Sequence, residues 1–282
     1  MKILLTGASS DTGLKLTKKL IENLNNFDEL YLITNSNPIV QKKDLNKSDK
    51  IKIINQNLLN TFENEINNAL KKIDILIHIA WIRPNKPSRT TDLNINVIKK
   101  ISNNLNKRAK VIYLSSVSGI PSAMSFYGKS KFETSKILFN SYDTCLFVCG
   151  LIITDNKNSP FFYLKRTIEK MPLLIKFGNK IRILYTDSDN VITEIYNKIF
   201  NFKKGIHKLY NDEDVTLDDF IKINFGLKKK IYINLGLFIN LFLFFLKFIN
   251  YIPFINKITD RLITLLTNDK KKTDEFVEGN FI

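Results

Sequence analysis

A tyrosine and a lysine four residues apart offer the clearest chemistry in the sequence. Tyr127 and Lys131 belong to the stretch YGKSK at the predicted start of a helix, and this spacing places both side chains on one helix face. A lysine ammonium beside a phenol lowers the phenol pKa from its usual value of about 10. Tyr127 is therefore suited to exchange a proton with a substrate hydroxyl or carbonyl near neutral pH.

A pair of serines precedes this helix. Ser115 and Ser116 end the run YLSS, and ligands of open α/β sheets bind at the carboxyl ends of the strands. Ser116 is therefore expected to hydrogen-bond the same substrate oxygen as Tyr127. The Tyr-x-x-x-Lys pattern alone is weak in a lysine-rich chain, where both residues also fit a solvated helix face. The order of glycine-rich turn, serine-ended strand and Tyr-x-x-x-Lys favours a catalytic set of Ser116, Tyr127 and Lys131.

The glycine-rich turn is TGASSDTG, which follows an apolar run at the N-terminus. Glycine is used in such turns where the backbone must approach a pyrophosphate. Gly7 and Gly13 fit that use, but Ser10 and Asp11 stand where a glycine is expected between them. A carboxylate about 4 Å from a phosphate costs roughly 1 kcal/mol in water and more at lower dielectric. Asp11 is therefore predicted to point away and to cap the following helix. An ordinary turn with no ligand is the alternative.

The elements that must position these residues alternate along the chain. Apolar runs typical of buried strands are separated by helical patterns, and strands that are apolar on both faces indicate a parallel, doubly wound α/β sheet of the Rossmann type. The predicted strands cover residues 2–7, 29–34, 51–57, 73–80, 110–116 and 144–153.

The rhythm changes after residue 151, where shorter elements appear. We predict a dinucleotide-binding Rossmann domain over residues 1–150. A smaller C-terminal substrate lobe over residues 151–282 is expected to be interleaved with the sheet and to carry an apolar helical tail over residues 231–266.

The chain has 282 residues and a formal net charge of +16. Such a charge suits a nucleic-acid surface, a membrane surface or a site for anionic substrates. The abundance of Lys, Asn and Ile, as in proteins from AT-rich genomes, is a competing explanation. The basic residues are scattered and not interleaved with aromatic residues, so no nucleic-acid partner is expected.

The cysteines and histidines do not suggest a metal site. Cys145 and Cys149 lie on one face of one predicted strand, so no disulfide is expected between them. His78 and His207 are too far apart in the sequence to suggest zinc. A strand begins at once at the N-terminus with no signal peptide, which predicts a cytoplasmic protein.

Several further motifs accompany the turn and the catalytic helix. The stretch ILIHIAW (75–81) ends the fourth predicted strand, NINV (94–97) lies in the next helix, and LFVCGLIIT and RILYTDSDNV (182–191) follow the YGKSKFETSKIL helix. Together these motifs resemble the extended short-chain dehydrogenases/reductases. The closest resemblance is to the NAD-dependent sugar-nucleotide epimerase/dehydratase family of the surface-polysaccharide type, and it covers nearly the whole chain.

The resemblance implies roles for residues from many elements. Ser116, Tyr127 and Lys131 would be catalytic. Ser116 and Arg182 would contact the substrate, Arg182 because a guanidinium fork suits phosphate oxygens. The residues implied to bind the cofactor are Gly7, Ser10, Asp11, Gly13, Asn35, Asn57, Leu58, Ala80, Trp81, Asn96, Tyr127, Lys131, Gly150 and Leu151.

Three departures from the family pattern bear on the cofactor. The middle glycine of the turn is missing, and Val148-Cys149 replaces the usual Arg-Pro before Gly150. The second strand ends in TNSN (34–37), without the acidic residue that binds the adenosine ribose 2′-hydroxyl in NAD enzymes. Lys42 and Lys43 could meet a 2′-phosphate, so the implied cofactor stays NAD or NADP.

The stretch 231–246 is apolar and uncharged, and basic residues flank it. A spanning helix needs about 20 apolar residues, so a transmembrane helix is not favoured. The stretch best fits peripheral contact with an anionic membrane, and burial in the lobe or in a homodimer interface is the alternative. Residues 256–276 resemble the C-terminal segment of epimerases that act on polysaccharide precursors, some of them linked to a polyprenyl diphosphate.

The sequence thus predicts an enzyme. It would be an NAD(P)-dependent epimerase or oxidoreductase that acts on a nucleotide-linked or lipid-linked sugar, in the cytoplasm or at the inner face of the cytoplasmic membrane. The alternative is a nucleotide-sensing or scaffold protein on a catalytically inactive version of the fold. The lost glycine favours this alternative, whereas the intact Ser-Tyr-Lys set argues against it.

Overall fold

The structure is a computed structural model of the chain. It describes residues 1–35, 48–84, 86–157, 159–170, 173–176, 178–213, 215–225, 231–234, 241, 244–246 and 256–279. Lys42 and Lys43 lie outside the described residues, as does most of the stretch 235–255.

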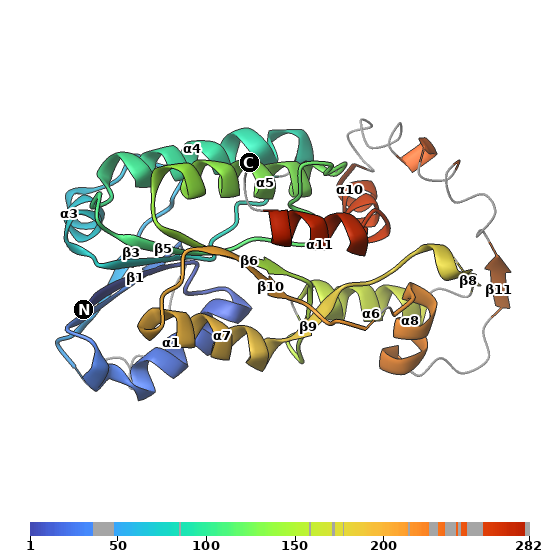
Figure 1. Cartoon of the computed structure of the whole chain (residues 1–282), viewed down its shortest axis with the longest axis horizontal. Helices are drawn as coiled ribbons and strands as arrows, with labels where there is room; N and C mark the ends of the chain where they lie inside the picture. The colour runs from blue at the N-terminus through green and yellow to red at the C-terminus, as the bar shows by residue number, and fades with distance from the viewer. Residues whose placement is uncertain are drawn as a thin grey trace.

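A parallel seven-stranded sheet runs through the centre of the molecule (Figure 1). Its strand order is β10-β6-β5-β4-β1-β2-β3, and every neighbouring pair is parallel. The predicted doubly wound α/β fold is confirmed, because the chain begins in the middle of the sheet and winds outward in both directions. The strands are β1 (Lys2–Thr6), β2 (Glu29–Thr34), β3 (Ile51–Asn55), β4 (Ile75–His78), β5 (Lys110–Leu114), β6 (Thr144–Cys149) and β10 (Gly205–Leu209).

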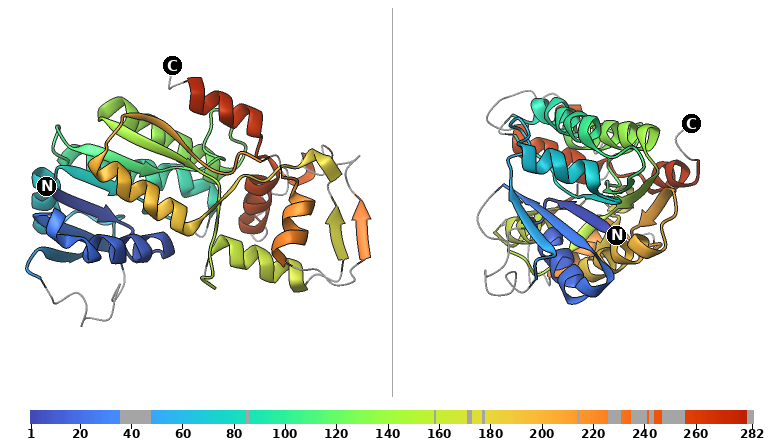
Figure 2. Two further views of the ribbon diagram at one scale, coloured as in Figure 1. Left: turned by 60° about the horizontal axis from the view of Figure 1, so that its bottom comes forward. Right: turned by 90° about the vertical axis from the view of Figure 1, so that its left-hand side faces the viewer.

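Helices cover both faces of the sheet (Figures 1 and 2). On one face lie α3 (Asn64–Lys72), α4 (Thr90–Asn104) and α5 (Phe126–Ser141), and on the other lie α1 (Asp11–Glu22) and α7 (Ser188–Phe200). Short 3₁₀ helices occur at Leu24–Asn26, Pro87–Arg89 and Gly178–Lys180.

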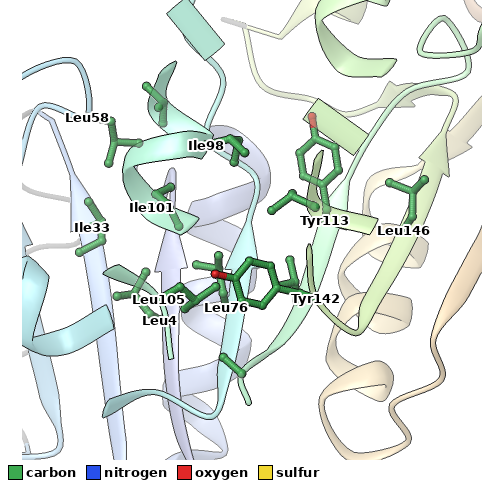
Figure 3. Close-up of a cluster of buried hydrophobic side chains, with 14 of the residues drawn as sticks. Leu4, Ile33, Leu58, Leu76, Ile98, Ile101, Leu105, Tyr113, Tyr142 and Leu146 are labelled. Carbon is green, nitrogen blue, oxygen red and sulfur yellow. The ribbon is translucent and has the colours of Figure 1, made fainter. Parts of the chain in front are cut away.

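Each face of the sheet has its own apolar core. Figure 3 shows part of the first core, where Leu4, Leu76 and Leu146 of the strands meet Ile98 and Ile101 of α4. The second core joins the opposite face to α1 and α7. Burial on both faces explains why the strands have no polar alternation in the sequence.

The predicted strand 144–153 is in fact two strands. β6 ends at Cys149, and β7 (Leu151–Ile153) belongs to a separate sheet with β9 (Tyr185–Asp187). A Cβ at Gly150 would lie 2.7 Å from the backbone of Leu184 and Tyr185. The chain therefore changes sheets at a residue where only glycine fits between the two backbones.

Residues beyond β7 build a smaller region at one end of the sheet and also return to the sheet. Leu217, Phe220 and Ile263 are buried in a third apolar cluster, which is separate from the two cores of the main sheet. The elements of this part are α6 (Pro160–Lys170), β8 (Leu173–Lys176), α8 (Leu217–Phe225), β11 (Ile231–Asn234), α10 (Asn256–Leu266) and α11 (Lys270–Gly279). The interleaving shows in α7 and β10, which return to the large sheet from this half of the sequence.

The expected helical tail over residues 231–266 is wrong at its start. Residues 231–234 form β11, a strand that pairs in parallel with β8, whereas the described residues 241, 244–246 and 256–266 are helical, the last of these forming α10. The sequence IYIN has the β-branched and aromatic residues that favour a strand. None of the helices in the described part of the chain has the length and apolarity needed to cross a bilayer.

Candidate active site

A cavity of about 240 Å³ opens at the carboxyl ends of β1, β2, β3 and β4. It lies where ligands of doubly wound sheets bind. The lining brings together seven of the residues that the sequence implicates in cofactor binding: Gly7, Ser10, Asn35, Asn57, Leu58, Ala80 and Trp81. Ser9, Ile33, Thr34, Gln56 and Ile82 complete the lining and were missed, although each lies within two positions of a predicted residue.

The two glycines of the turn are required by its geometry. Gly7 has a φ of 77°, and a Cβ there would lie 2.8 Å from the backbone of Ala80. A Cβ on Gly13 would lie 2.1 Å from the Gly7 carbonyl oxygen. The turn is therefore closed tightly against both the start of α1 and the end of β4, with no room for a side chain at either glycine.

Ser10, and not Asp11, is the N-cap of α1. The Ser10 hydroxyl accepts a hydrogen bond from the Gly13 amide at 3.0 Å, and Asp11 is the first residue of the helix. The prediction that Asp11 caps the helix is therefore wrong by one position. Serine is among the best N-cap residues, so the serine that stands in place of the expected glycine caps the helix.

The Asp11 carboxylate instead binds the segment that follows β7. The Thr154 hydroxyl donates to it at 3.0 Å, and the Asn156 side-chain amide donates at 2.8 Å. This explains why a carboxylate is tolerated beside a turn suited to phosphate: its oxygens bind two donors of its own chain. Asp11 thus connects the glycine-rich turn to the region after β7.

Two polar side chains on α4 fix the other walls of the cavity. Asn94 is buried, accepts from the Ile82 amide and donates to the Ile82 carbonyl, both at 3.0 Å. The Lys100 ammonium donates to the carbonyls of Leu58, Leu59 and Asn60 at 2.7–2.8 Å. Asn96, the residue predicted for the site, is exposed. Residues two apart on a helix face nearly opposite directions, so Asn94, and not Asn96, contacts the backbone of the cavity residue Ile82.

Ser116, Tyr127 and Lys131 come together beside this cavity. Ser116 and Lys131 are buried, and a side-chain hydrogen bond joins Ser116 to the Tyr127 phenol. The Tyr127 ring lies edge-on to the Trp81 ring, with 5.1 Å between the ring centres. Since Trp81 also lines the cavity, it connects the cavity to the three residues that the sequence predicts to be catalytic.

The electrostatics of this set differ from the sequence-based expectation. Burial raises the pKa of Tyr127, and the hydrogen bond with Ser116 and the charge of Arg83 only partly oppose that rise. Lys131 donates to the Leu114 carbonyl at 2.8 Å and lies over the rings of Trp81 and Tyr113. Burial lowers the pKa of Lys131 to about 7. In this arrangement burial dominates, so the pKa of Tyr127 is raised and not lowered as expected.

Two other titratable groups surround Lys131 and are kept neutral by burial. Burial lowers the pKa of His78 to about 3 and raises the pKa of the Cys149 thiol to about 12. The His78 Nδ1 atom and the Thr6 hydroxyl are hydrogen-bonded at 2.7 Å, and the His78 ring stacks on Tyr113. Cys145 and Cys149 are both free thiols, as expected from their spacing.

The remaining predicted residues lie toward the second region. Gly150 and Leu151 sit at the change of sheets, where the Leu151 amide donates to the Leu184 carbonyl at 2.8 Å. Arg182 pairs through its backbone with Thr216, and its charge acts on the Asp219 carboxyl. Contact of Arg182 with a substrate phosphate stays a prediction. No cluster of His, Cys, Asp or Glu side chains suited to a metal occurs among the residues the structure describes.

Together, the sheet order and the glycine turn define a Rossmann-like α/β fold, and solved sugar-nucleotide epimerases share it. A nucleoside-diphosphate-sugar epimerase from Staphylococcus aureus has a similar structure, with a TM-score of 0.69 at 15% identity over 99% of this chain and 96% of the other. A UDP-glucose 4-epimerase from Thermotoga maritima, solved with UDP-glucose, has a TM-score of 0.61 at 16% identity, covering 83% and 86% of the two chains.

A third similar structure was solved with a dinucleotide. The UDP-glucuronic acid 4-epimerase from Bacillus cereus, in complex with NAD, has a TM-score of 0.62 at 17% identity and covers 83% of this chain and 85% of its own. By sequence, no protein-family model and no curated protein matches the chain. The likeness is therefore one of fold.

Proposed function

We propose that this chain is an NAD(P)-dependent epimerase or oxidoreductase that acts on a sugar linked to a nucleotide diphosphate. The observation that carries the proposal is the junction at Trp81, which lines the cavity and contacts the Tyr127 ring. A dinucleotide held with its adenosine half in the cavity would extend toward the buried Ser116, Tyr127 and Lys131.

The cavity residues fit such a cofactor. Gly7 and Ser10 place the N-terminus of α1 at one wall, where backbone amides favour a phosphate. Asn57 and Leu58 form the opposite wall, suited to an adenine, and Asn35 lies at the end of β2 near the expected ribose. None of the described residues at that end of β2 is acidic, which leaves NAD and NADP as alternatives.

The chemistry then divides between cofactor and chain. A bound nicotinamide would accept a hydride from a sugar carbon. Tyr127 would take the proton of the adjacent hydroxyl, and Ser116 would hold the same oxygen. In its protonated form, Lys131 would favour the phenolate that this proton transfer requires, against the rise that burial gives the pKa of Tyr127. Return of the hydride to the opposite face of the sugar would give an epimer, and release of the reduced cofactor would give an oxidised sugar.

A more specific version of the proposal names a polyprenyl-diphosphate-linked sugar at the inner face of the cytoplasmic membrane. The supporting features are the net charge of +16 and the exposed side chains of Leu241, Phe244 and Phe245. Vesicles that contain anionic lipid should bind the protein, more weakly as salt increases. Replacing Phe244 and Phe245 with Ser should weaken this binding and preserve turnover of a soluble sugar nucleotide. If the intact protein fails to bind at low salt, the lipid-linked substrate loses its support.

The test of the main proposal is a panel of sugar nucleotides, each incubated with NAD or with NADP. Epimeric products would be detected by NMR and oxidation by the absorbance of the reduced cofactor. Turnover that disappears in Tyr127→Phe would support the proposal. Tight binding of a dinucleotide with no turnover of any sugar would instead favour the nucleotide-sensing alternative.

A further inference from the structure

A buried carboxylate from the far end of the chain contacts the catalytic helix. Asp260 lies in α10, is 7% exposed, and accepts hydrogen bonds from the backbone amides of Phe126 at 2.8 Å and Tyr127 at 3.3 Å. These amides belong to the first turn of α5, so the contact crosses 134 residues of sequence. None of the proposed chemistry makes use of this group.

The first turn of a helix has amides without intrahelical partners. In α5, the Ser125 hydroxyl accepts from the Gly128 amide at 3.0 Å, which satisfies one of them. Asp260 satisfies the amides of the first and second helical residues, where an anion is also favoured by the helix dipole. The backbone of Tyr127 is thus held between its own N-cap and a side chain of another element.

A second contact connects α10 and the residues just after it to the loop that follows Ser116. The Ser118 hydroxyl lies 3.0 Å from the Asn268 side-chain oxygen and 3.4 Å from the Thr264 carbonyl, and its own amide donates to the Ser116 hydroxyl. The same C-terminal segment therefore contacts the chain next to both Ser116 and Tyr127. Helices α10 and α5 also pack directly against each other.

We propose that Asp260 is a positioning residue, which fixes the backbone of Tyr127 so that its phenol meets Ser116 and the reacting oxygen. The proposal rests on the proposed function for its effect on turnover. Misplacement of a catalytic group by about 1 Å can cost on the order of 100-fold in rate. A group that acts only on the position of Tyr127 should leave the cofactor cavity, which lies on other elements, unchanged.

The test compares Asp260→Ala with Asp269→Ala. Asp269 caps α11 in the same C-terminal segment, accepting from the Lys272 amide at 3.2 Å, and so provides a matched loss of one helix cap. Asp260→Ala should lower kcat about 10- to 100-fold with KM and cofactor Kd within about twofold. Asp260→Asn retains an acceptor oxygen and should recover part of the rate. Asp269→Ala should keep the wild-type kcat.

A second measurement does not depend on turnover. Hydrogen exchange at the amides of Phe126 and Tyr127 should become faster in Asp260→Ala and stay unchanged in Asp269→Ala. Unchanged exchange would overturn the proposal even if no sugar substrate is found. Faster exchange with an unchanged kcat in an active enzyme would also overturn it, because the bonds would then serve only the stability of α5. If Asp260→Ala does not fold, hydrogen exchange at these two amides and kcat are measured in Asp260→Asn, and the same outcomes support or overturn the proposal.

Discussion

The two ends of the candidate site are held in place by different kinds of interaction. At the glycine turn the constraint is steric and local, since a Cβ on Gly13 would lie 2.1 Å from the Gly7 carbonyl oxygen. At the catalytic helix the constraint is polar and distant, because Asp260 reaches the Tyr127 amide from α10. Changes at the first end should therefore affect the fold and cofactor binding, and changes at the second should affect turnover.

The largest effect is expected from Tyr127→Phe. Removal of the phenol hydroxyl removes the proposed acid/base group, and such groups contribute about 10²- to 10⁴-fold to the rate. The kcat should fall by that factor while the cofactor Kd and the free energy of unfolding stay close to wild type. Tyr196→Phe on α7 is the control, because it removes a surface hydroxyl from the opposite face of the sheet. Activity in Tyr127→Phe equal to that of the control would refute the catalytic assignment.

Gly13→Ala should lower stability and dinucleotide binding, the two properties that Tyr127→Phe leaves unchanged. The added methyl group would collide with the backbone of Gly7 and Ala8, neither of which can rotate away. We expect a loss of about 3 kcal/mol in the free energy of unfolding, together with loss of dinucleotide binding. Gly279→Ala at the end of α11 meets no atom within 4 Å and should be neutral. Chemical denaturation and isothermal titration measure both quantities; normal dinucleotide binding by Gly13→Ala would contradict the steric account.

The buried Lys131 should make stability depend on pH. Its pKa is about 7 in the folded protein and 10.5 in the unfolded chain, so the unfolded state binds more protons between these values. Stability should therefore rise with pH across this window, by at most about 1.4 kcal/mol per pH unit from this group. The free energy of unfolding of wild type minus that of Lys131→Met should increase from pH 7 to pH 10. A flat difference would show that Lys131 keeps an ordinary pKa.

The smallest effect is expected at Asp11, which lies beside the glycine turn and makes polar contacts with a distant segment of the chain. Asp11→Ala removes two hydrogen bonds to a charged group, from Thr154 and Asn156. The free energy of unfolding should fall by about 2 kcal/mol. The dinucleotide Kd should stay nearly unchanged, because Asp11 is not among the residues that line the cavity. Asp189→Ala, which breaks the surface ion pair with Lys15 and a long hydrogen bond of 3.4 Å from the Ser188 hydroxyl, should cost under about 1 kcal/mol. A large rise in Kd for Asp11→Ala would show a direct role in binding the cofactor.

Most of the main sheet could be predicted from the sequence. The strands are apolar on both faces and short, so their composition marks them even without alternation. The exception at residues 144–153 is instructive. The apolar run is continuous, and the change of sheets at Gly150 depends on the approach of Leu184, which lies in a distant part of the chain.

The candidate site was predictable where its residues follow strand ends directly. Gly7, Asn57 and Trp81 are of this kind, and all three line the cavity. The contact of Asn94 with Ile82 could not be predicted, because the motif contains two asparagines and the sequence does not show which of them faces the sheet. The raised pKa of Tyr127 was missed because burial, which the sequence does not give, outweighs its polar neighbours. Asp260 had no signal at all, since nothing near it in the sequence relates to α5.

The order of strands in the large sheet also governs how the chain can fold. The first strand to be synthesised, β1, becomes a central strand and pairs with β2 and β4. The free edge of β6 is paired only after β10 has been synthesised. Helix α7, which packs against α1, is synthesised just before β10. Parallel pairings across such long loops form slowly. A nascent chain that stalls before residue 205 would therefore leave an unpaired edge beside a buried strand, a state prone to aggregation.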